Sequence, residues 1–127
     1  TMADRLLLVM AVSDGELIGG ALNFIGTDTL YGRNWGATVH IQNLHFEACY
    51  YQAIDFAITH KLRCVEAGAQ GAHKIKRGYL PKITYSAHYI FNDKLKLAIK
   101  NFLSEEREIV LNEINHINTN YSPFKSI

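Results

Sequence analysis

The sequence has few cysteines and no long apolar run, and each shortage narrows what the protein can be. Only two of its 127 residues are cysteines, Cys49 and Cys64. Both have apolar neighbours, so we expect buried thiols in a reducing compartment rather than a disulfide. No apolar run approaches the ~20 residues of a membrane span, and the short run after Arg5 is too brief for a signal peptide. We therefore expect a cytoplasmic protein without a membrane partner.

The net charge is low, and histidines or cysteines at metal-binding spacing are absent from the sequence. The formal net charge is +1, which argues against a globally basic nucleic-acid binder but not against one basic pocket. Histidine and cysteine never recur at H-x-x-H or C-x-x-C spacing, so no metal site is expected. Internal repeats and low-complexity segments are absent from the sequence as well. The length and the 48% hydrophobic content indicate a single ordinary globular domain.

The first third of the sequence predicts an antiparallel meander. The first strand is apolar on both faces, as in a central strand. Asp14-Gly15 is a two-residue hairpin turn that needs positive φ. Gly19-Gly20 marks a bulge or a close approach of two backbones. The three expected strands span residues 5–13, 16–25 and 30–35.

The rest of the sequence alternates helices and strands. Asn43 is the expected N-cap of a helix to about Lys61, and Asn92-Asp93 caps a final helix to about Asn118. The final helix would be about 40 Å long at ~1.5 Å per residue, more than a domain of this size needs. Two strands are expected between the helices, at 63–66 and 83–91. The apolar face of the first helix comprises Phe46, Cys49, Tyr50, Ala53, Ala57 and Ile58.

The functional candidates converge on residues 66–81, EAGAQGAHKIKRGYLP, which follow an expected strand. Glycines allow positive φ and close approach of a ligand, and exposed amides beside cations form a concave anion site. A plain basic surface loop is the alternative reading. The glycines are Gly68, Gly71 and Gly78, the cations and imidazole are His73, Lys74, Lys76 and Arg77, and the acid and amide are Glu66 and Gln70.

This mixture of groups suits a site where a proton moves and a carbonyl oxygen gains charge. A histidine titrates close to neutral pH, so His73 is the candidate base, with His88 and His45 as alternatives. Glu66 is a second candidate for holding or deprotonating an amine. The helix dipole explains the position of Glu47, because an acidic side chain is favourable near the start of a helix. Tyr51 is a candidate for lining the acceptor pocket, whereas Tyr50 is expected in the core.

Several segments resemble known proteins. Lys76-Arg77-Gly78-Tyr79 looks like the K-x-G-[F/Y] element of FemAB/FemX-type peptidoglycan aminoacyltransferases, although Ile75 replaces the usual preceding aromatic residue. A bacterial FemAB-like family, labelled GNAT-type N-acyltransferases or peptidoglycan biosynthesis/recognition proteins, is similar over nearly the whole chain. The segments that carry this likeness are HFEACYYQ (45–52), EAGAQGAHK (66–74), YSAHYI (85–90) and SPF (122–124).

The resemblance implies an α+β, GNAT-like (acyl-CoA N-acyltransferase-like) fold with a mostly antiparallel sheet, flanking helices and a long C-terminal helix. It implies that Lys76 contacts the donor and stabilises the oxyanion. Family members are longer, so the chain is expected to be the C-terminal piece of a larger architecture. The substrate is then small or carrier-linked, and peptidoglycan precursors are candidates.

The sequence leaves two candidate acyl donors, acyl-CoA and aminoacyl-tRNA. The pyrophosphate motif [Q/R]-x-x-G-x-[G/A] is absent between Gly36 and Asn43, which disfavours acetyl-CoA and favours the tRNA acceptor end or another carrier. Two further hypotheses are a non-catalytic recognition module and an interaction fragment. In the latter, the long helix contacts a missing N-terminal domain or forms a homodimer.

Overall fold

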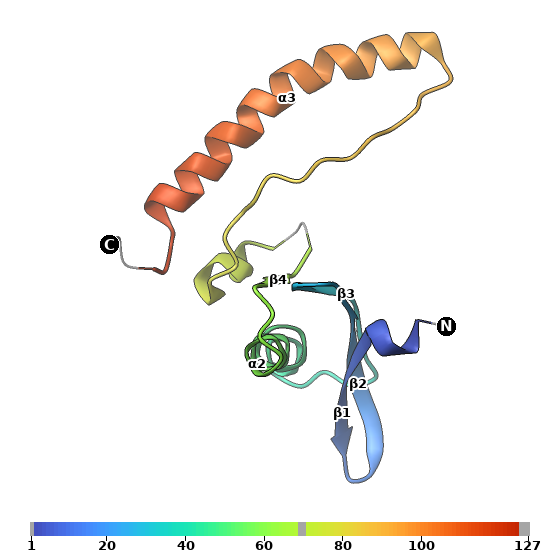
Figure 1. The fold of residues 1–127 in the computed structure, drawn as a ribbon, viewed down its shortest axis with the longest axis vertical. Coiled ribbons are helices and arrows are strands. Elements are labelled where there is room, and N and C mark those ends of the chain that lie inside the picture. The colour runs from blue at the N-terminus through green and yellow to red at the C-terminus, as the bar shows by residue number, and fades with distance from the viewer. Residues whose placement is uncertain (1, 69–70, 125–127) are drawn as a thin grey trace. The chain divides into compact units, whose positions relative to one another are not determined.

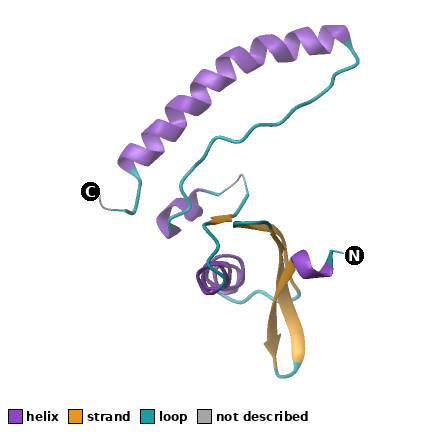
Figure 2. Cartoon of the chain, viewed as in Figure 1, coloured by secondary structure: helices purple, strands orange, loops and turns teal. Residues whose placement is uncertain are grey.

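The computed structural model describes residues 2–68 and 71–124 of the chain (Figure 1). It divides into two compact units, Thr1–Gly71 and Ala72–Ile127. The first unit holds the sheet and a helical segment, and the second holds a short 3₁₀ helix and one long α-helix (Figure 2). The fold class is α+β, as the family resemblance implies.

The first unit contains a mixed four-stranded sheet in the order β1-β2-β3-β4. A 3₁₀ turn, η1 (Ala3–Arg5), precedes β1. β1 (Leu6–Ser13), β2 (Glu16–Ile25) and β3 (Thr29–Ala37) form the predicted antiparallel meander, and β4 (Cys64–Glu66) runs parallel to β3. The prediction that β1 is a central strand is wrong. β1 lies at the edge, and its second apolar face carries Leu8 and Met10 to the surface, 62% and 59% exposed.

Glycines shape the turns of the meander. Asp14 and Gly15 have φ of 51° and 84°, which confirms the predicted hairpin turn. A Cβ at Gly19 would lie 3.1 Å from the carbonyl oxygen of Gly36, so the close-approach reading of the Gly19-Gly20 pair is confirmed. The register shifts lie elsewhere, between Ala11 and Val12 and between Leu22 and Asn23.

One helical segment follows the meander, and it changes hydrogen-bond pattern midway. It consists of α1 (Leu44–Phe46), the π-helical turn η2 (Glu47–Tyr51) and α2 (Gln52–Thr59). Asn43 occupies the N-cap position with φ of 66°, yet within the described part of the chain its side chain makes no capping hydrogen bond. The predicted helix is therefore present, but it starts without the predicted cap and contains an inserted π turn.

The core of the first unit lies between this helical segment and the sheet. η2 contacts β1 and β2, and α2 contacts β3 and β4. Tyr50 is buried as predicted, but Ile58 is 71% exposed, so its assignment to the apolar face is wrong. Ile58 lies about 100° around the helix from the buried Ala57, beyond the edge of the buried stripe. The buried apolar residues are Ala21, Leu30, Ala48, Tyr50, Ala53 and Ala57.

The second unit begins with the 3₁₀ helix η3 (Ala72–Arg77) and ends with α3 (Asp93–Asn120), which extends about 42 Å at ~1.5 Å per residue. The Asn92 side chain accepts a hydrogen bond from the Leu95 amide at 3.0 Å, confirming the predicted cap. The strand predicted at 83–91 is wrong, because this described stretch is irregular. A strand needs a hydrogen-bonded neighbour, and Tyr85 and Phe91 are instead 92% and 90% exposed.

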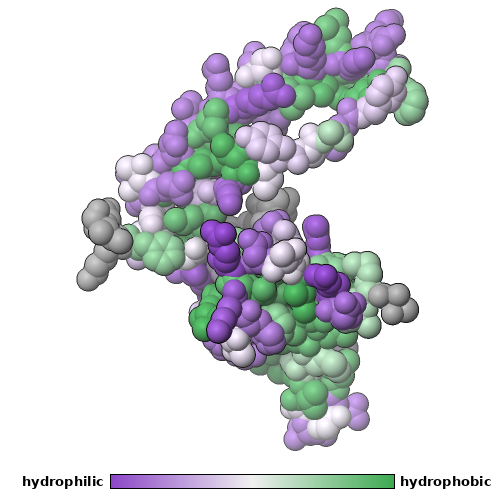
Figure 3. All heavy atoms as spheres, in the orientation of Figure 1, coloured by the Kyte–Doolittle hydropathy of each residue, from purple (hydrophilic) through white to green (hydrophobic). Residues whose placement is uncertain are grey.

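Hydropathy varies along the surface of each unit (Figure 3). Apolar side chains are exposed both on the sheet and along α3. Among the helices of the described ranges, none is both long enough and apolar enough to cross a membrane.

Candidate functional site

The predicted basic residues form a short helix with two distinct faces. A 3₁₀ helix has three residues per turn, so side chains at i and i+3 are aligned. In η3 this rule pairs His73 with Lys76 and Lys74 with Arg77. His73 and Lys76 are exposed, whereas Lys74 and Arg77 are half-buried. The structure therefore presents the candidate base and the candidate oxyanion ligand together, on the exposed face of one turn.

The half-buried face of η3 holds the turn in place. The Arg77 guanidinium donates a hydrogen bond from Nη1 to the His73 carbonyl oxygen at 2.9 Å. Burial lowers the pKa of Lys74 below its ordinary value, because desolvation disfavours the charged ammonium. Arg77 therefore bridges one turn of η3, and Lys74 is partly withdrawn from solvent, while the His73 and Lys76 side chains are exposed.

Each described glycine of the predicted loop has the backbone conformation expected of it. φ is 76° at Gly68, 111° at Gly71 and 87° at Gly78, values that other residues rarely adopt. Gly78 ends η3, where its amide donates to the Ile75 carbonyl at 3.0 Å. A Cβ there would lie 2.9 Å from Cζ of Phe124, so two of the motif segments, KRGY and SPF, meet in the second unit.

Other predicted site residues lie in the first unit or outside the helix. Glu66 ends β4 opposite Tyr31 and is exposed. Tyr51 ends the π turn and is 44% exposed. Gln70 lies outside the described residues. His88 is exposed in the irregular stretch, with its Nε2 2.8 Å from Oγ of Ser86. Their part in a site remains a prediction from the sequence.

The alternative histidine, His45, belongs to an aromatic cluster. Its ring centroid is 5.6 Å from that of Trp35 and 5.4 Å from that of Tyr50. Glu47, the first residue of the π turn, accepts a hydrogen bond from Nε2 of Gln52 at 2.8 Å. Packing explains His45, and the hydrogen bond across the π turn adds to the helix-dipole explanation of Glu47. The π turn itself has no signature in residue type that sequence reasoning could have used.

The two cysteines are free thiols in different surroundings. Cys49 is half-buried in the π turn, and burial raises its pKa to about 11. Cys64 is exposed in β4, so the prediction of two buried thiols is wrong for this residue. β4 has only three residues at the other edge of the sheet, and its alternate side chains point away from the helical segment. No cluster of three potential metal ligands occurs in the ranges that the structure describes.

A family model described as FemAB-like, peptidoglycan biosynthesis/recognition, matches residues 1–126. The chain belongs to the FemAB-like family. Comparison with curated proteins and with solved structures found no match. The family match confirms the resemblance carried by the HFEACYYQ, EAGAQGAHK, YSAHYI and SPF segments, and with it a role in peptidoglycan biosynthesis or recognition.

The conformation of Gly78 gives a test of the basic turn in this FemAB-like chain. Gly78→Ala should lower protection of the amides of residues 72–80 by about five- to thirtyfold, since a left-handed backbone costs a non-glycine residue about 1–2 kcal/mol. Amide hydrogen exchange read by mass spectrometry measures this change. Gly78→Asn is the matched control, because it adds the same Cβ beside Phe124 but tolerates positive φ. Equal protection in Gly78→Ala and the parent would contradict the assigned conformation.

Proposed function

We propose that this chain is a GNAT-like N-acyltransferase domain that moves an acyl or aminoacyl group onto an amine of a peptidoglycan precursor. The observation that carries the proposal is the shared exposed face of His73 and Lys76 on η3. The family's role in peptidoglycan chemistry and the order of meander, helix and parallel strand support it.

The proposed reaction needs one proton acceptor and one cation. The acceptor amine attacks the donor carbonyl carbon, and Lys76 stabilises the oxyanion that forms on the carbonyl oxygen. His73 takes the proton that the attacking nitrogen releases. Collapse of the intermediate forms the amide and expels the carrier's thiolate or alkoxide, which takes up that proton.

A recognition module is the second candidate, and one observation favours it. His73 and Lys76 face water, where a charge stabilises an oxyanion less than it does in a dry site. The same face suits binding of a phosphate-bearing precursor or a tRNA end without turnover. The family's description includes recognition as well as biosynthesis.

Turnover separates these two candidates. The full chain is incubated with acyl-CoAs or aminoacyl-tRNA mimics and a UDP-linked muropeptide, and amide formation is followed by mass spectrometry. Lys76→Ala should reduce the rate by about 10²–10³-fold, the usual effect of losing an oxyanion ligand. Lys82→Ala removes another exposed lysine of the same unit, and it should leave the rate unchanged. If the chain binds the phosphate-bearing ligands but forms no amide with any pair of donor and acceptor, the recognition module is supported instead.

Anion binding at η3 can be measured independently of turnover. The double variant Lys76→Ala with Arg77→Ala should weaken binding of a UDP-linked ligand, because it removes two positive charges from η3. Calorimetry at low salt measures the affinity. Lys94→Ala with Lys96→Ala removes the same charge from α3 and serves as the control. Parent-like affinity in the η3 double variant would place the anion site elsewhere.

Acetyl-CoA itself should bind weakly. The segment between Gly36 and Asn43 lacks the glycine-rich pyrophosphate motif of ordinary acetyltransferases. A titration that gives micromolar affinity would contradict this expectation and would restore acetyl-CoA as the donor.

A further inference from the structure

The SPF segment, residues 122–124, carries part of the family resemblance but has no role in the proposed reaction. It follows Tyr121, which is the C-cap of α3. Pro123 cannot extend the helix, because proline lacks an N–H donor. The Phe124 amide instead donates a hydrogen bond to Oγ of Ser122 at 3.3 Å. The segment is therefore a hydrogen-bonded turn rather than a continuation of α3.

The Phe124 ring lies against the backbone of Gly78, the residue that follows η3. A Cβ at Gly78 would lie 2.9 Å from Cζ of the ring, 3.6 Å from Cε2 and 3.8 Å from Cε1. Carbon atoms in van der Waals contact are about 3.5–4.0 Å apart, so the ring occupies space that a side chain at this position would need. The contact joins the beginning and the end of the second unit.

Two backbone hydrogen bonds at the same glycine close η3 in the pattern of a Schellman motif. The Gly78 amide donates to the Ile75 carbonyl oxygen at 3.0 Å, and the Tyr79 amide donates to the Lys74 carbonyl oxygen at 3.2 Å. The motif needs a left-handed residue between them, and Gly78 has φ of 87°. Gly78 therefore meets two requirements, because its backbone makes the turn and its missing side chain leaves room for Phe124.

This contact bears on the site because η3 is short. η3 has six residues, and a helical turn of this length gains few hydrogen bonds for the dihedral angles that it fixes. His73 and Lys76 are aligned only while the 3₁₀ turn is formed, since alignment at i and i+3 is a property of that helix. A contact that holds the closing turn of η3 therefore also holds these two exposed side chains on one face.

We propose that Phe124 is a positioning residue for the anion-binding face of η3. Its ring holds Gly78 and the closing turn, and this keeps the Lys76 ammonium beside the His73 imidazole, where both can meet a phosphate group. Phe124 carries no charge, so it acts through the backbone rather than on the anion. The use of this face in transfer rests on the proposed function, whereas the binding test needs no turnover.

The test measures binding of inorganic pyrophosphate to the full chain by calorimetry at low salt. Phe124→Ala should weaken the affinity about three- to tenfold, because the apparent dissociation constant rises as the fraction of chains with a formed turn falls. Phe124→Leu keeps an apolar contact and should recover most of the loss. Phe102→Ala is the matched control, since Phe102 lies in the same unit and is 61% exposed, against 63% for Phe124. It should bind like the parent.

A double-variant cycle with Gly78→Ala tests whether the two residues act through their contact. In the parent, the new Cβ strains the left-handed backbone and also displaces the ring, whereas in Phe124→Ala only the strain remains. The double variant should therefore bind pyrophosphate more tightly than the product of the two single effects predicts.

Several results would overturn the proposal. Parent-like affinity in Phe124→Ala, an equal loss in Phe102→Ala, or independent effects of the two substitutions in the cycle would each do so. A parent chain that binds no pyrophosphate, or binding that Lys76→Ala leaves unchanged, would also overturn it, because η3 then has no anion site to position. A chain that forms no amide but keeps the Phe124 dependence would remove the proposed transfer and leave this inference standing.

Discussion

Leu30→Ala should lower the free energy of unfolding of the first unit by about 2–5 kcal/mol. Leu30 is the largest fully buried apolar side chain, with 0% exposure. It pairs with Ile25 of β2 on one side and Val65 of β4 on the other. The substitution leaves a cavity at the junction of the antiparallel and parallel parts of the sheet. Because a small domain is stable by only about 5–15 kcal/mol, the loss is a large share of the total.

Urea denaturation followed by tryptophan fluorescence measures this loss. Trp35 is the only tryptophan in the sequence, and it lies in β3, so the signal reports on the first unit. Leu8→Ala is the matched control, since it makes the same change on the same sheet at a side chain that is 62% exposed. It should cost less than 1 kcal/mol by the area rule. A Leu30→Ala variant as stable as the Leu8→Ala variant would contradict the assigned core.

Local chemistry explains which features the sequence predicted correctly. Asp14-Gly15 forms the expected turn because few other residue pairs tolerate two successive positive φ angles. Asn92 caps α3 because its carboxamide reaches the Leu95 amide three residues on. Gly78 has the predicted positive φ for the same kind of reason, because a single residue meets a single backbone requirement.

Features that depend on distant parts of the chain were not predictable in the same way. Asn43 has the same chemistry as Asn92, yet it adopts φ of 66°, and within the described residues its side chain makes no cap. The alternation at 83–91 has the pattern of a strand, but no neighbouring strand pairs with it among the described residues. The apolar pattern of β1 fits a central strand equally well, because the pattern does not say what covers each face. For β1 and for residues 83–91, the missing information is which other element pairs with or covers the segment.

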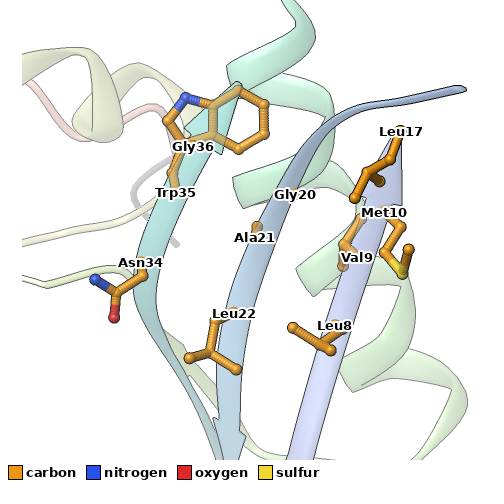
Figure 4. Close-up of a pocket in the computed structure, with 10 residues that line it drawn as sticks. All are labelled: Leu8, Val9, Met10, Leu17, Gly20, Ala21, Leu22, Asn34, Trp35 and Gly36. Carbon is orange, nitrogen blue, oxygen red and sulfur yellow. The ribbon is translucent and has the colours of Figure 1, made fainter. Parts of the chain in front are cut away.

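The candidate site also combines features set by local residue types with features set by distant parts of the chain. The residue types at 72–78 predicted an anion-binding turn, and the structure adds the pairing of His73 with Lys76 that a 3₁₀ helix produces. The shallow apolar cavity lined by Gly20 and Gly36 was not predictable, since it depends on the register that places these two glycines opposite each other (Figure 4). The sequence predicted the backbone role of Gly19-Gly20, whereas only the register shows that Gly20 also lines this cavity.

We expect the chain to form a homodimer through the distal part of α3. Ile109 and Val110 are 64% and 42% exposed there, and burial of such a side chain contributes about 1.5–3 kcal/mol. Ile114 and Ile117 extend the same apolar surface toward the end of the helix, where they are half-buried. Contiguous apolar surface of this kind is rare on soluble monomers. The charged residues Glu105, Glu106, Arg107 and Glu108 interrupt the stripe midway, so a two-fold contact of the distal turns is expected rather than a continuous coiled coil.

Light scattering at micromolar concentration tests this assembly, because a dimer has twice the chain mass of 14.4 kDa. Ile109→Gln with Val110→Gln should return the mass to that of one chain, since two polar side chains would enter the contact. Leu95→Gln with Leu97→Gln is the control at the other end of α3, where the side chains are 53% and 61% exposed. That variant should stay dimeric. A parent mass near 14.4 kDa would contradict the dimer outright, and a monomeric control would move the contact to the first turns of the helix.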